Sequence, residues 1–259
     1  MQKILNKSGF ICDMDGVIYR GSRVLPGVPE FIQWMMENDK KFIFLTNSPE
    51  RTPQELSMKL RRMGLEVSAD HFYTSAMATA EFLASQCPGC TAYVIGEPSL
   101  TKAMYDQGIY MNDVNPEYVV LGETRTYCFE KVEKAIELVN KGAKLIGCNP
   151  DTIGIMEKGV IPATGSLIAP IEIATGKKAY FVGKPNPLIV RKALNRIGCH
   201  SSEIAFIGDR MDTDVIAGIE SSLDTVLVLS GVTHQEDVDN FPYRPKYILN
   251  GICDLVNGL

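Results

Sequence analysis

The chain has 259 residues, of which 45% are hydrophobic and 22% charged, an ordinary composition for one large globular domain or two smaller ones. Its 26 Lys and Arg residues against 31 Asp and Glu residues give a formal net charge of −5, with no basic block. These figures exclude a disordered chain and argue against a nucleic-acid polymer as a partner, since phosphate backbones are bound by clustered basic side chains. The sequence has no apolar run of about 18 residues, so no membrane-spanning helix is expected.

The cysteines suggest a reducing compartment. Seven is an odd number in a long chain with ample apolar material, which favours free thiols in a cytoplasmic protein over a disulfide framework. No signal peptide is expected at residues 1–10. Cys87 and Cys90 have a spacing found in redox sites and in half of a zinc site, but no second such pair exists. Pro88 and Gly89 between them favour a plain turn, and the role of the two thiols stays open.

Short apolar runs rich in β-branched and aromatic residues predict buried strands. In chain order they are residues 10–12, 42–45, 92–95, 118–121, 144–146, 180–182, 204–207 and 226–229. Most of the intervening segments have helical periodicity; the stretch 129–141, for example, places Val132 and Ile136 on one face. This alternation predicts an α/β fold with a parallel sheet covered by helices on both faces, although so many units can also close into a barrel.

Polar or charged residues follow four of these strands. They are Asp13-Met14-Asp15-Gly16, Thr46-Asn47-Ser48, Gly183-Lys184-Pro185 and the segment Gly208–Asp214. Taken singly, each has a structural explanation as a turn, a helix cap, a solvated lysine or a set of capping acids. Because ligands of open parallel sheets bind beyond the carboxyl ends of the strands, the four segments together predict one site.

The residue types in these segments suit phosphoryl transfer. Asp13 and Asp209, with a main-chain carbonyl near Asp15, offer the oxygen ligands that a hard cation such as Mg²⁺ prefers. Thr46 and Lys184 present a hydroxyl and an ammonium group to an anion. An aspartate can serve as a nucleophile and form an aspartyl-phosphate, and a carboxyl two residues further on can protonate the leaving oxygen and then activate water.

Three competing motifs fail on spacing. A calcium-binding loop that starts at Asp13 would need an acid or amide and then a glycine where the chain has Val17 and Ile18. The first strand-to-helix turn lacks G-x-G-x-x-G, and the chain contains no G-x-x-x-x-G-K-[ST]. A dinucleotide-binding turn and a P-loop are therefore not expected.

In their order and spacing the four segments resemble the motifs of the haloacid dehalogenase (HAD) superfamily, and most closely those of its NagD-type phosphatases. Further similar stretches lie at 73–80, 119–125, 149–152 and 228–232, so that the resemblance covers nearly the whole chain. It implies a Rossmann-like catalytic core formed by residues 1–78 and 180–259. An α/β cap domain of class IIA, residues 79–179, would be inserted into that core.

The resemblance also implies roles for individual residues. These are Asp13 as nucleophile, Asp15 as acid and base, Thr46, Asn47 and Lys184 on the phosphate, Asp13, Asp15 and Asp209 as ligands of Mg²⁺, and Asp214 in support of the metal site. Dehalogenases of the superfamily lack a carboxyl at the position of Asp15, so its presence favours a phosphatase.

The predicted function is therefore Mg²⁺-dependent hydrolysis of small soluble phosphate esters through an aspartyl-phosphate. Nucleoside monophosphates are favoured by the resemblance, with sugar phosphates next. A phosphotransferase or phosphomutase, which would pass the phosphoryl group to an acceptor, is the nearest alternative, and a non-catalytic ligand-binding protein would not need the nucleophile and the acid. The cap segments 149–158, 162–166 and 123–125 are candidates for substrate contacts. An ordinary turn is slightly favoured for the first and a helix start for the second, and a surface role explains the third equally well. A cap of this kind also offers a surface for a homo-oligomer, and the oligomeric state and the physiological substrate stay open.

Overall fold

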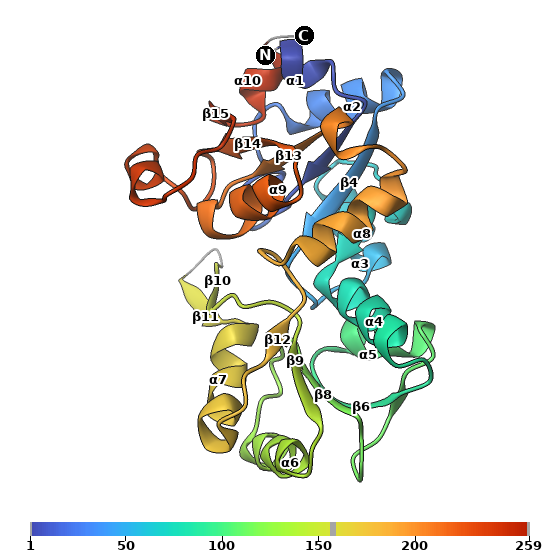
Figure 1. Ribbon diagram of the computed structural model, residues 1–259. Coiled ribbons are helices and arrows are strands. Elements are labelled where there is room, and N and C mark those ends of the chain that lie inside the picture. Colours follow the sequence, from blue (N-terminus) through green and yellow to red (C-terminus); the bar gives the residue numbers. More distant parts are fainter. Residues whose placement is uncertain (1, 156–158, 258–259) are drawn as a thin grey trace. The chain divides into compact units, whose positions relative to one another are not determined.

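The structure, a computed structural model, describes residues 2–155 and 159–257. The chain divides into two compact units (Figure 1). The first unit comprises Met1–Thr46, Pro53–Tyr73 and Lys184–Leu259, and the second comprises Asn47–Thr52 and Thr74–Gly183.

The first unit is built on a six-stranded sheet with the strand order β15-β14-β13-β1-β4-β5. The pairs β1–β13, β1–β4, β13–β14 and β14–β15 are parallel. The strands are β1 (Gly9–Cys12), β4 (Lys41–Thr46), β5 (Phe72–Thr74), β13 (Ile204–Gly208), β14 (Asp224–Val228) and β15 (Tyr247–Leu249). Since the sheet ends at β15 and β5, it is open, and the barrel alternative is wrong.

Helices and a small hairpin complete the first unit. The α-helices are α1 (Gln2–Leu5), α2 (Val28–Glu37), α3 (Pro53–Arg62), α8 (Pro187–Ile197), α9 (Ile216–Glu220) and α10 (Cys253–Val256). The unit also has the short 3-10 helices η1 (Ala69–His71), η2 (Ser201–Glu203) and η4 (Gln235–Asn240), and the π-helical segment η3 (Met211–Val215). The antiparallel hairpin joins β2 (Tyr19–Arg20) to β3 (Arg23–Val24). Every residue of β1 is buried, as expected of a central strand covered on both faces. Phe10, Phe31 and Phe44 belong to the hydrophobic core around it.

The second unit contains its own five-stranded parallel sheet, with the order β12-β9-β8-β6-β7. Its strands are β6 (Thr91–Ile95), β7 (Tyr110–Met111), β8 (Tyr118–Leu121), β9 (Lys144–Gly147) and β12 (Tyr180–Phe181), and its helices are α4 (Ser75–Gln86), α5 (Pro98–Asp106), α6 (Phe129–Asn140) and α7 (Thr164–Thr175). An antiparallel hairpin pairs β10 (Ile153–Ile155) with β11 (Val160–Pro162). Val119, Leu138 and Ile168 lie in a core cluster confined to this unit.

All eight expected strands are present, as is the amphipathic helix predicted at 129–141. The fold class is confirmed as α/β with parallel sheets flanked by helices. The pair Cys87 and Cys90 lies in the turn that ends α4, where the amide of Cys90 donates to the carbonyl of Cys87 at 3.1 Å. Both thiols are free.

The boundaries of the two units differ from those expected at residues 78 and 180. The predicted core includes the strand at 180–182, but β12 pairs with β9 and therefore belongs to the sheet of the second unit. The amides of Val182 and Gly183 extend this contact by donating to the carbonyls of Gly147 and Cys148. The first unit resumes at Lys184, and the segment Asn47–Thr52 falls in the second unit.

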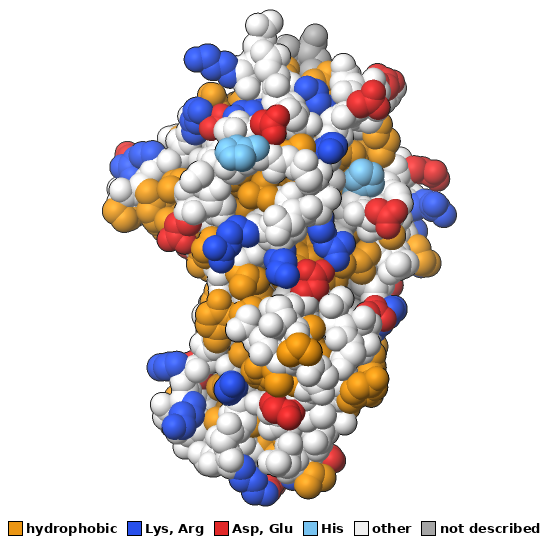
Figure 2. All heavy atoms as spheres, turned by 45° about the vertical axis from the view of Figure 1, so that its right-hand side comes forward, with side chains coloured by type: hydrophobic (Ala, Val, Ile, Leu, Met, Phe, Trp, Pro, Cys, Tyr) orange, Lys and Arg blue, Asp and Glu red, His pale blue; other side chains and the backbone are white. Residues whose placement is uncertain are grey.

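Acidic and basic side chains lie close to one another on the face of the molecule drawn in Figure 2, with hydrophobic side chains between them. Within the described part of the chain, none of the helices has the length and apolar character needed to cross a membrane.

Candidate active site

Three adjacent strands of the first unit end in the residues that the sequence singled out. Asp13 directly follows β1, Thr46 is the last residue of β4, and Asp209 directly follows β13. β1 lies between β4, which the chain forms next in this sheet, and β13, with which the chain later continues on the opposite side of β1. The amide of Asp13 still donates to the carbonyl of Ile207 at 2.8 Å, which holds the two strand ends together. Such a reversal of strand order is where open α/β sheets bind ligands.

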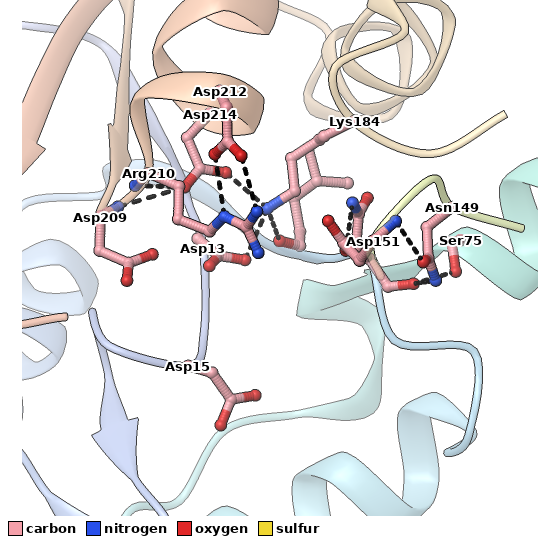
Figure 3. A network of polar contacts seen from close by, with 12 residues as sticks. Asp13, Asp15, Ser75, Asn149, Asp151, Lys184, Asp209, Arg210, Asp212 and Asp214 are labelled. Atoms are coloured by element: carbon pink, nitrogen blue, oxygen red, sulfur yellow. Dashed lines mark hydrogen bonds and ion pairs between the residues drawn. The ribbon is translucent and has the colours of Figure 1, made fainter. Parts of the chain in front are cut away.

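Lys184 joins two carboxylates in the interior of the first unit (Figure 3). Its Nζ lies 2.6 Å from Oδ1 of Asp13 and 2.7 Å from Oδ1 of Asp214. It also donates to the main-chain carbonyl of Leu45 at 3.3 Å, and its side chain is only 2% exposed. A buried ammonium group with these acceptors is a fixed positive charge beside Asp13.

The titration of Asp13 and Lys184 reflects this burial. Burial raises the pKa of Asp13 well above its usual range, and the charges of Asp214 and Asp209 add to the shift, while Lys184 opposes it. Burial by itself would lower the pKa of Lys184, but the carboxylates of Asp13 and Asp214 raise it above the ordinary lysine value. The lysine is therefore charged at neutral pH, and its charge lies beside the carboxyl groups of Asp13 and Asp214.

Asp214 is fully engaged with groups of the protein. Its Oδ1 accepts the bond from Lys184, and its Oδ2 accepts from the amides of Asp209 and Arg210, each at 3.1 Å. Gly208 makes room for it, because a Cβ at that position would lie 2.2 Å from the Cβ of Asp214. With both oxygens used in this way, Asp214 is suited to hold the strand end of Asp209 and the ammonium of Lys184 in place.

Asp209 has one oxygen that the protein leaves unsatisfied. Its Oδ2 accepts the amide of Val232 at 2.7 Å, whereas its buried Oδ1 has no hydrogen-bond partner within the described residues. Two glycines enclose the carboxylate: a Cβ at Gly231 would lie 1.9 Å from Oδ2, and one at Gly16 would lie 2.5 Å from it. Burial, with the charge of Asp214, raises the pKa of Asp209 to about 7.

These observations fit a bound cation. Asp13, Asp209 and Asp214 each offer a carboxylate oxygen, and the three oxygens lie within 4.8 Å of one another. A buried acceptor without a donor is costly, and a metal ion would satisfy Oδ1 of Asp209. All of the donors in this group are carboxylate oxygens, as hard divalent cations require. The buried triad can therefore hold a metal ion.

Asp15 lies on the same loop as Asp13, but its side chain is not part of this carboxylate group. It is exposed, and its Oδ2 accepts the phenol hydroxyl of Tyr19 at 3.1 Å. The carboxyl groups of Asp13 and Asp15 therefore lie in different environments, which suits two carboxyls that perform different chemical tasks.

Thr46 is buried in the first unit, whereas Asn47, the next residue, belongs to the second. There the side-chain amide of Asn47 donates to Oδ2 of Asp151 at 2.9 Å. The carbonyl of Asn47 accepts bonds from the side chains of Ser75 and Asn149, the latter at 2.8 Å. The backbone at Asn47 is thus fixed by groups of the second unit.

A buried carboxyl supports this arrangement. Glu123 is 8% exposed, and its Oε1 accepts from Asn149 at 3.0 Å and from Thr164 at 3.4 Å. Its Oε2 accepts from Ser48 at 3.3 Å. Burial raises the pKa of Glu123 to about 7. Glu123 and Asn149, from the candidate cap segments 123–125 and 149–158, are thus buried and hydrogen-bonded to each other within the second unit. Residues 156–158 of the second segment lie outside the described part of the chain.

The sequence does not identify Tyr19 or Gly231 as parts of these arrangements, and it points to Glu123 only as part of the segment 123–125. Tyr19 lies four residues after Asp15, and Gly16 between them is the residue in the sequence that indicates a turn which could bring the two together. Gly231 lies in the stretch 228–232 that resembles the phosphatases, but its close approach to Asp209 depends on packing between distant segments.

Two family models match the chain. A model described as haloacid dehalogenase-like hydrolase matches residues 10–110, and one described as HAD-hydrolase-like matches residues 181–255. Together they cover all four motif segments, and they confirm the resemblance on which the expected site residues were based.

Two curated relatives match over nearly the full chain. A dihydroxyacetone phosphatase of Corynebacterium glutamicum is 47% identical over 248 residues, which are 96% of this chain and 90% of the relative. The ribonucleotide monophosphatase NagD of Escherichia coli is 43% identical over 245 residues, covering 95% and 96% of the two chains.

Solved structures agree in fold. The structure of NagD from Escherichia coli superimposes with a TM-score of 0.91 at 42% identity, over 96% of this chain and 98% of that one. A 4-nitrophenylphosphatase from Thermotoga maritima superimposes with a TM-score of 0.93 at 35% identity, over 97% of each chain.

Proposed function

This chain belongs to the haloacid dehalogenase-like hydrolases, and from that membership we propose that it hydrolyses small phosphate monoesters with the aid of Mg²⁺. It is a phosphatase of this family, as are its relatives at 43–47% identity. The observation that carries the proposed mechanism is the buried group of Asp13, Lys184, Asp209 and Asp214 beyond the strand ends.

In the first step, a carboxylate oxygen of Asp13 attacks the phosphorus atom of the ester. The bond from phosphorus to the leaving oxygen breaks, and its electron pair goes to that oxygen, which takes a proton from the carboxyl of Asp15. The products of this step are the free alcohol and an aspartyl-phosphate on Asp13.

In the second step, the carboxylate of Asp15 accepts a proton from a water molecule as the water oxygen attacks the phosphorus. The acyl phosphate bond breaks, which restores the carboxylate of Asp13 and releases inorganic phosphate. Thr46, Asn47 and Lys184 bind the phosphate, Thr46 and Asn47 as hydrogen-bond donors and Lys184 through the positive charge that it holds beside Asp13.

Asp13, Asp15 through its main chain, and Asp209 would hold Mg²⁺, with Asp214 positioning Asp209 and Lys184. Bound there, the ion supplies positive charge for the transferring phosphoryl group. The unsatisfied Oδ1 of Asp209 and the raised pKa values of Asp13 and Asp209 support a cation at this place.

We assign two substrate classes. Nucleoside monophosphates are favoured by the relative named as a ribonucleotide monophosphatase. Sugar phosphates, including triose phosphates, are favoured by the relative named as a dihydroxyacetone phosphatase. A cytoplasmic location accords with the seven free cysteines.

The test is release of inorganic phosphate from 4-nitrophenyl phosphate, a panel of nucleoside monophosphates, and triose and hexose phosphates. Each is run with Mg²⁺ and with a chelator. We expect release that depends on the metal and is lost in Asp13→Asn, whose fold is checked by circular dichroism. Asp212→Asn is the matched control, because Asp212 is exposed and paired with Arg210 at 2.8 Å. Equal rates in parent and Asp13→Asn would overturn the assignment of the nucleophile.

Phosphoryl transfer to an acceptor is separated from hydrolysis by the products. With an added alcohol or sugar, a hydrolase releases inorganic phosphate equal to the substrate consumed. A phosphotransferase would instead form a new ester at the expense of inorganic phosphate, and that outcome would replace the hydrolytic proposal.

A further inference from the structure

The loop that follows Asp13 folds back on itself and brings Tyr19 to Asp15. The amide of Gly16 donates to the carbonyl of Tyr19 at 2.8 Å, and the amide of Tyr19 donates to the carbonyl of Met14 at 3.2 Å. Gly16 has a φ of 81°, which permits the reversal. In this closed loop the phenol hydroxyl of Tyr19 donates to Oδ2 of Asp15 at 3.1 Å.

The ring of Tyr19 is held by its surroundings. It is 2% exposed and belongs to the hydrophobic core of the first unit, whereas Asp15 at the end of its hydrogen bond is exposed. Nζ of Lys59, on α3, lies 3.6 Å from the ring centroid and covers one face. A rigid buried donor thus meets the carboxyl of a residue whose side chain reaches solvent.

We propose that Tyr19 is a positioning residue for Asp15: its hydroxyl fixes the orientation of the carboxyl that protonates the leaving oxygen. This inference rests on the proposed function. An exposed aspartate can adopt several side-chain rotamers, and a hydrogen bond from a buried phenol selects one of them.

This role predicts that alkyl and aryl phosphate esters respond differently to the loss of the hydroxyl. An alkyl ester, such as a nucleoside or sugar phosphate, leaves as a strongly basic alkoxide unless it is protonated during bond breaking. A 4-nitrophenolate ion is stable and leaves without a proton. A well-placed acid therefore accelerates cleavage of the alkyl esters and contributes little to cleavage of the aryl ester. A hydroxyl that merely stabilises the loop would affect both kinds of ester alike.

The test is Tyr19→Phe, which removes the hydroxyl and keeps the ring. The quantity compared is kcat/KM, because it reports the steps up to formation of the aspartyl-phosphate and excludes its hydrolysis. For the best alkyl ester of the panel we expect kcat/KM to fall about tenfold, a part of the ~10²–10⁴-fold that general acid catalysis supplies. For 4-nitrophenyl phosphate we expect a change of less than about twofold on the same reasoning.

Two further variants make the result interpretable. Tyr127→Phe is the matched control, because that phenol is also part-buried and donates to a main-chain carbonyl, that of Leu167, at 2.7 Å in the second unit. It should leave both substrates unaffected. Asp15→Asn should reproduce the selective loss for alkyl esters, and more strongly.

An equal loss for both substrates in Tyr19→Phe, or no loss for either, would overturn the positioning role. Failure of the proposed function has a different signature, because the parent enzyme would then release no phosphate from any ester. If Asp15→Asn shows no selectivity between the esters, the acid is another residue, and the role of Tyr19 falls with that of Asp15.

Discussion

At the scale of single residues, the charges of the site depend on Lys184. Its ammonium nitrogen lies 2.6 Å from Oδ1 of Asp13 and 2.7 Å from Oδ1 of Asp214. The side chain is almost fully buried, so water could not take over these contacts if the lysine were removed. In Lys184→Met these two carboxyls lose their cation and must either stay charged without a partner or take up protons. We expect the free energy of unfolding to fall by about 3–5 kcal/mol and phosphate release to be lost.

Urea unfolding of Lys184→Met measures this cost. The control is Lys246→Met, because Lys246 pairs with Asp224 at 2.7 Å but its side chain is 54% exposed. Exposed pairs contribute little, so the control should unfold near the midpoint of the parent. A Lys184→Met protein as stable as this control would contradict the view that the buried lysine compensates both carboxylates.

Glu123 gives a prediction about pH. Its pKa is about 7 in the folded protein against an ordinary value of 4.5, so the folded state binds the proton more tightly than the unfolded state. The ionised group therefore costs stability, and the cost grows as the pH rises from about 4.5 to about 7. Gln at this position cannot ionise. Relative to the parent, Glu123→Gln should gain melting temperature across this window and level off above it.

Melting curves at closely spaced pH values, with chelator present, test this sign. Glu137→Gln serves as the control, because Glu137 lies on the surface of α6 and its bonds to Lys141 and Lys134 lower its pKa. It should not gain with rising pH. A difference between Glu123→Gln and the parent that does not change with pH would contradict the raised pKa.

At the scale of elements, the segment after β14 closes around the carboxylate of Asp209. Gly231→Ala would place a Cβ 1.9 Å from Oδ2 of Asp209, so the carboxylate must move and give up its bond to Val232. We expect the Mg²⁺ concentration for half-maximal phosphate release to rise at least about tenfold, as for the loss of a group that orients a metal ligand.

A metal titration of phosphate release measures this change, and the rise in melting temperature on adding Mg²⁺ gives a second readout independent of turnover. Gly251→Ala is the matched control, since the nearest atom to its Cβ would be Sγ of Cys253 at an ordinary 3.7 Å. An unchanged Mg²⁺ concentration for half-maximal release in Gly231→Ala would show that the position of the Asp209 carboxylate does not determine metal binding.

The elements also mark where sequence reasoning succeeds. Most of the eight expected strands are revealed by their apolar runs because they are largely buried, as in β1 and β8, where every residue is buried. The short strands β10 and β11 carry exposed residues such as Ile153 and Val160 and follow no periodic pattern that would reveal them. The sequence predicts β12 as a strand but does not reveal to which sheet it belongs, because its pairing with β9 is a tertiary contact.

The residues of the candidate site also separate into those that the sequence predicts and those that it does not. Residue types at the strand ends, together with the family resemblance, select Asp13, Lys184, Asp209 and Asp214, which the structure brings together in the first unit. The bond from Tyr19 and the close approach of Gly231 involve the path of the chain after a turn, which residue type and spacing do not determine.

At the scale of the whole molecule, each unit has its own hydrophobic core. Ile207 is fully buried in the core of the first unit, and Ile168 is fully buried in that of the second. Truncation of either to Ala should cost about 2–5 kcal/mol. Because the two clusters share no residue, we expect Ile168→Ala to accelerate amide exchange mainly in residues 74–183 and Ile207→Ala mainly in the first unit.

Hydrogen exchange resolved by peptide mass spectrometry makes this comparison, with each variant as the control for the other. Faster exchange throughout both units in either variant would mean that they unfold as one cooperative body.

The central position of β1 has a consequence for biosynthesis. Its partner on one side, β4, follows within 46 residues of the start of the chain, but its partner on the other side, β13, begins at Ile204. The second unit, which ends at Gly183, is therefore synthesised in full while one edge of β1 still has no neighbour. An unpaired, wholly apolar strand edge is prone to pair with other chains. The growing chain is thus most vulnerable to aggregation during this interval, and factors that shield nascent chains on the ribosome would act there.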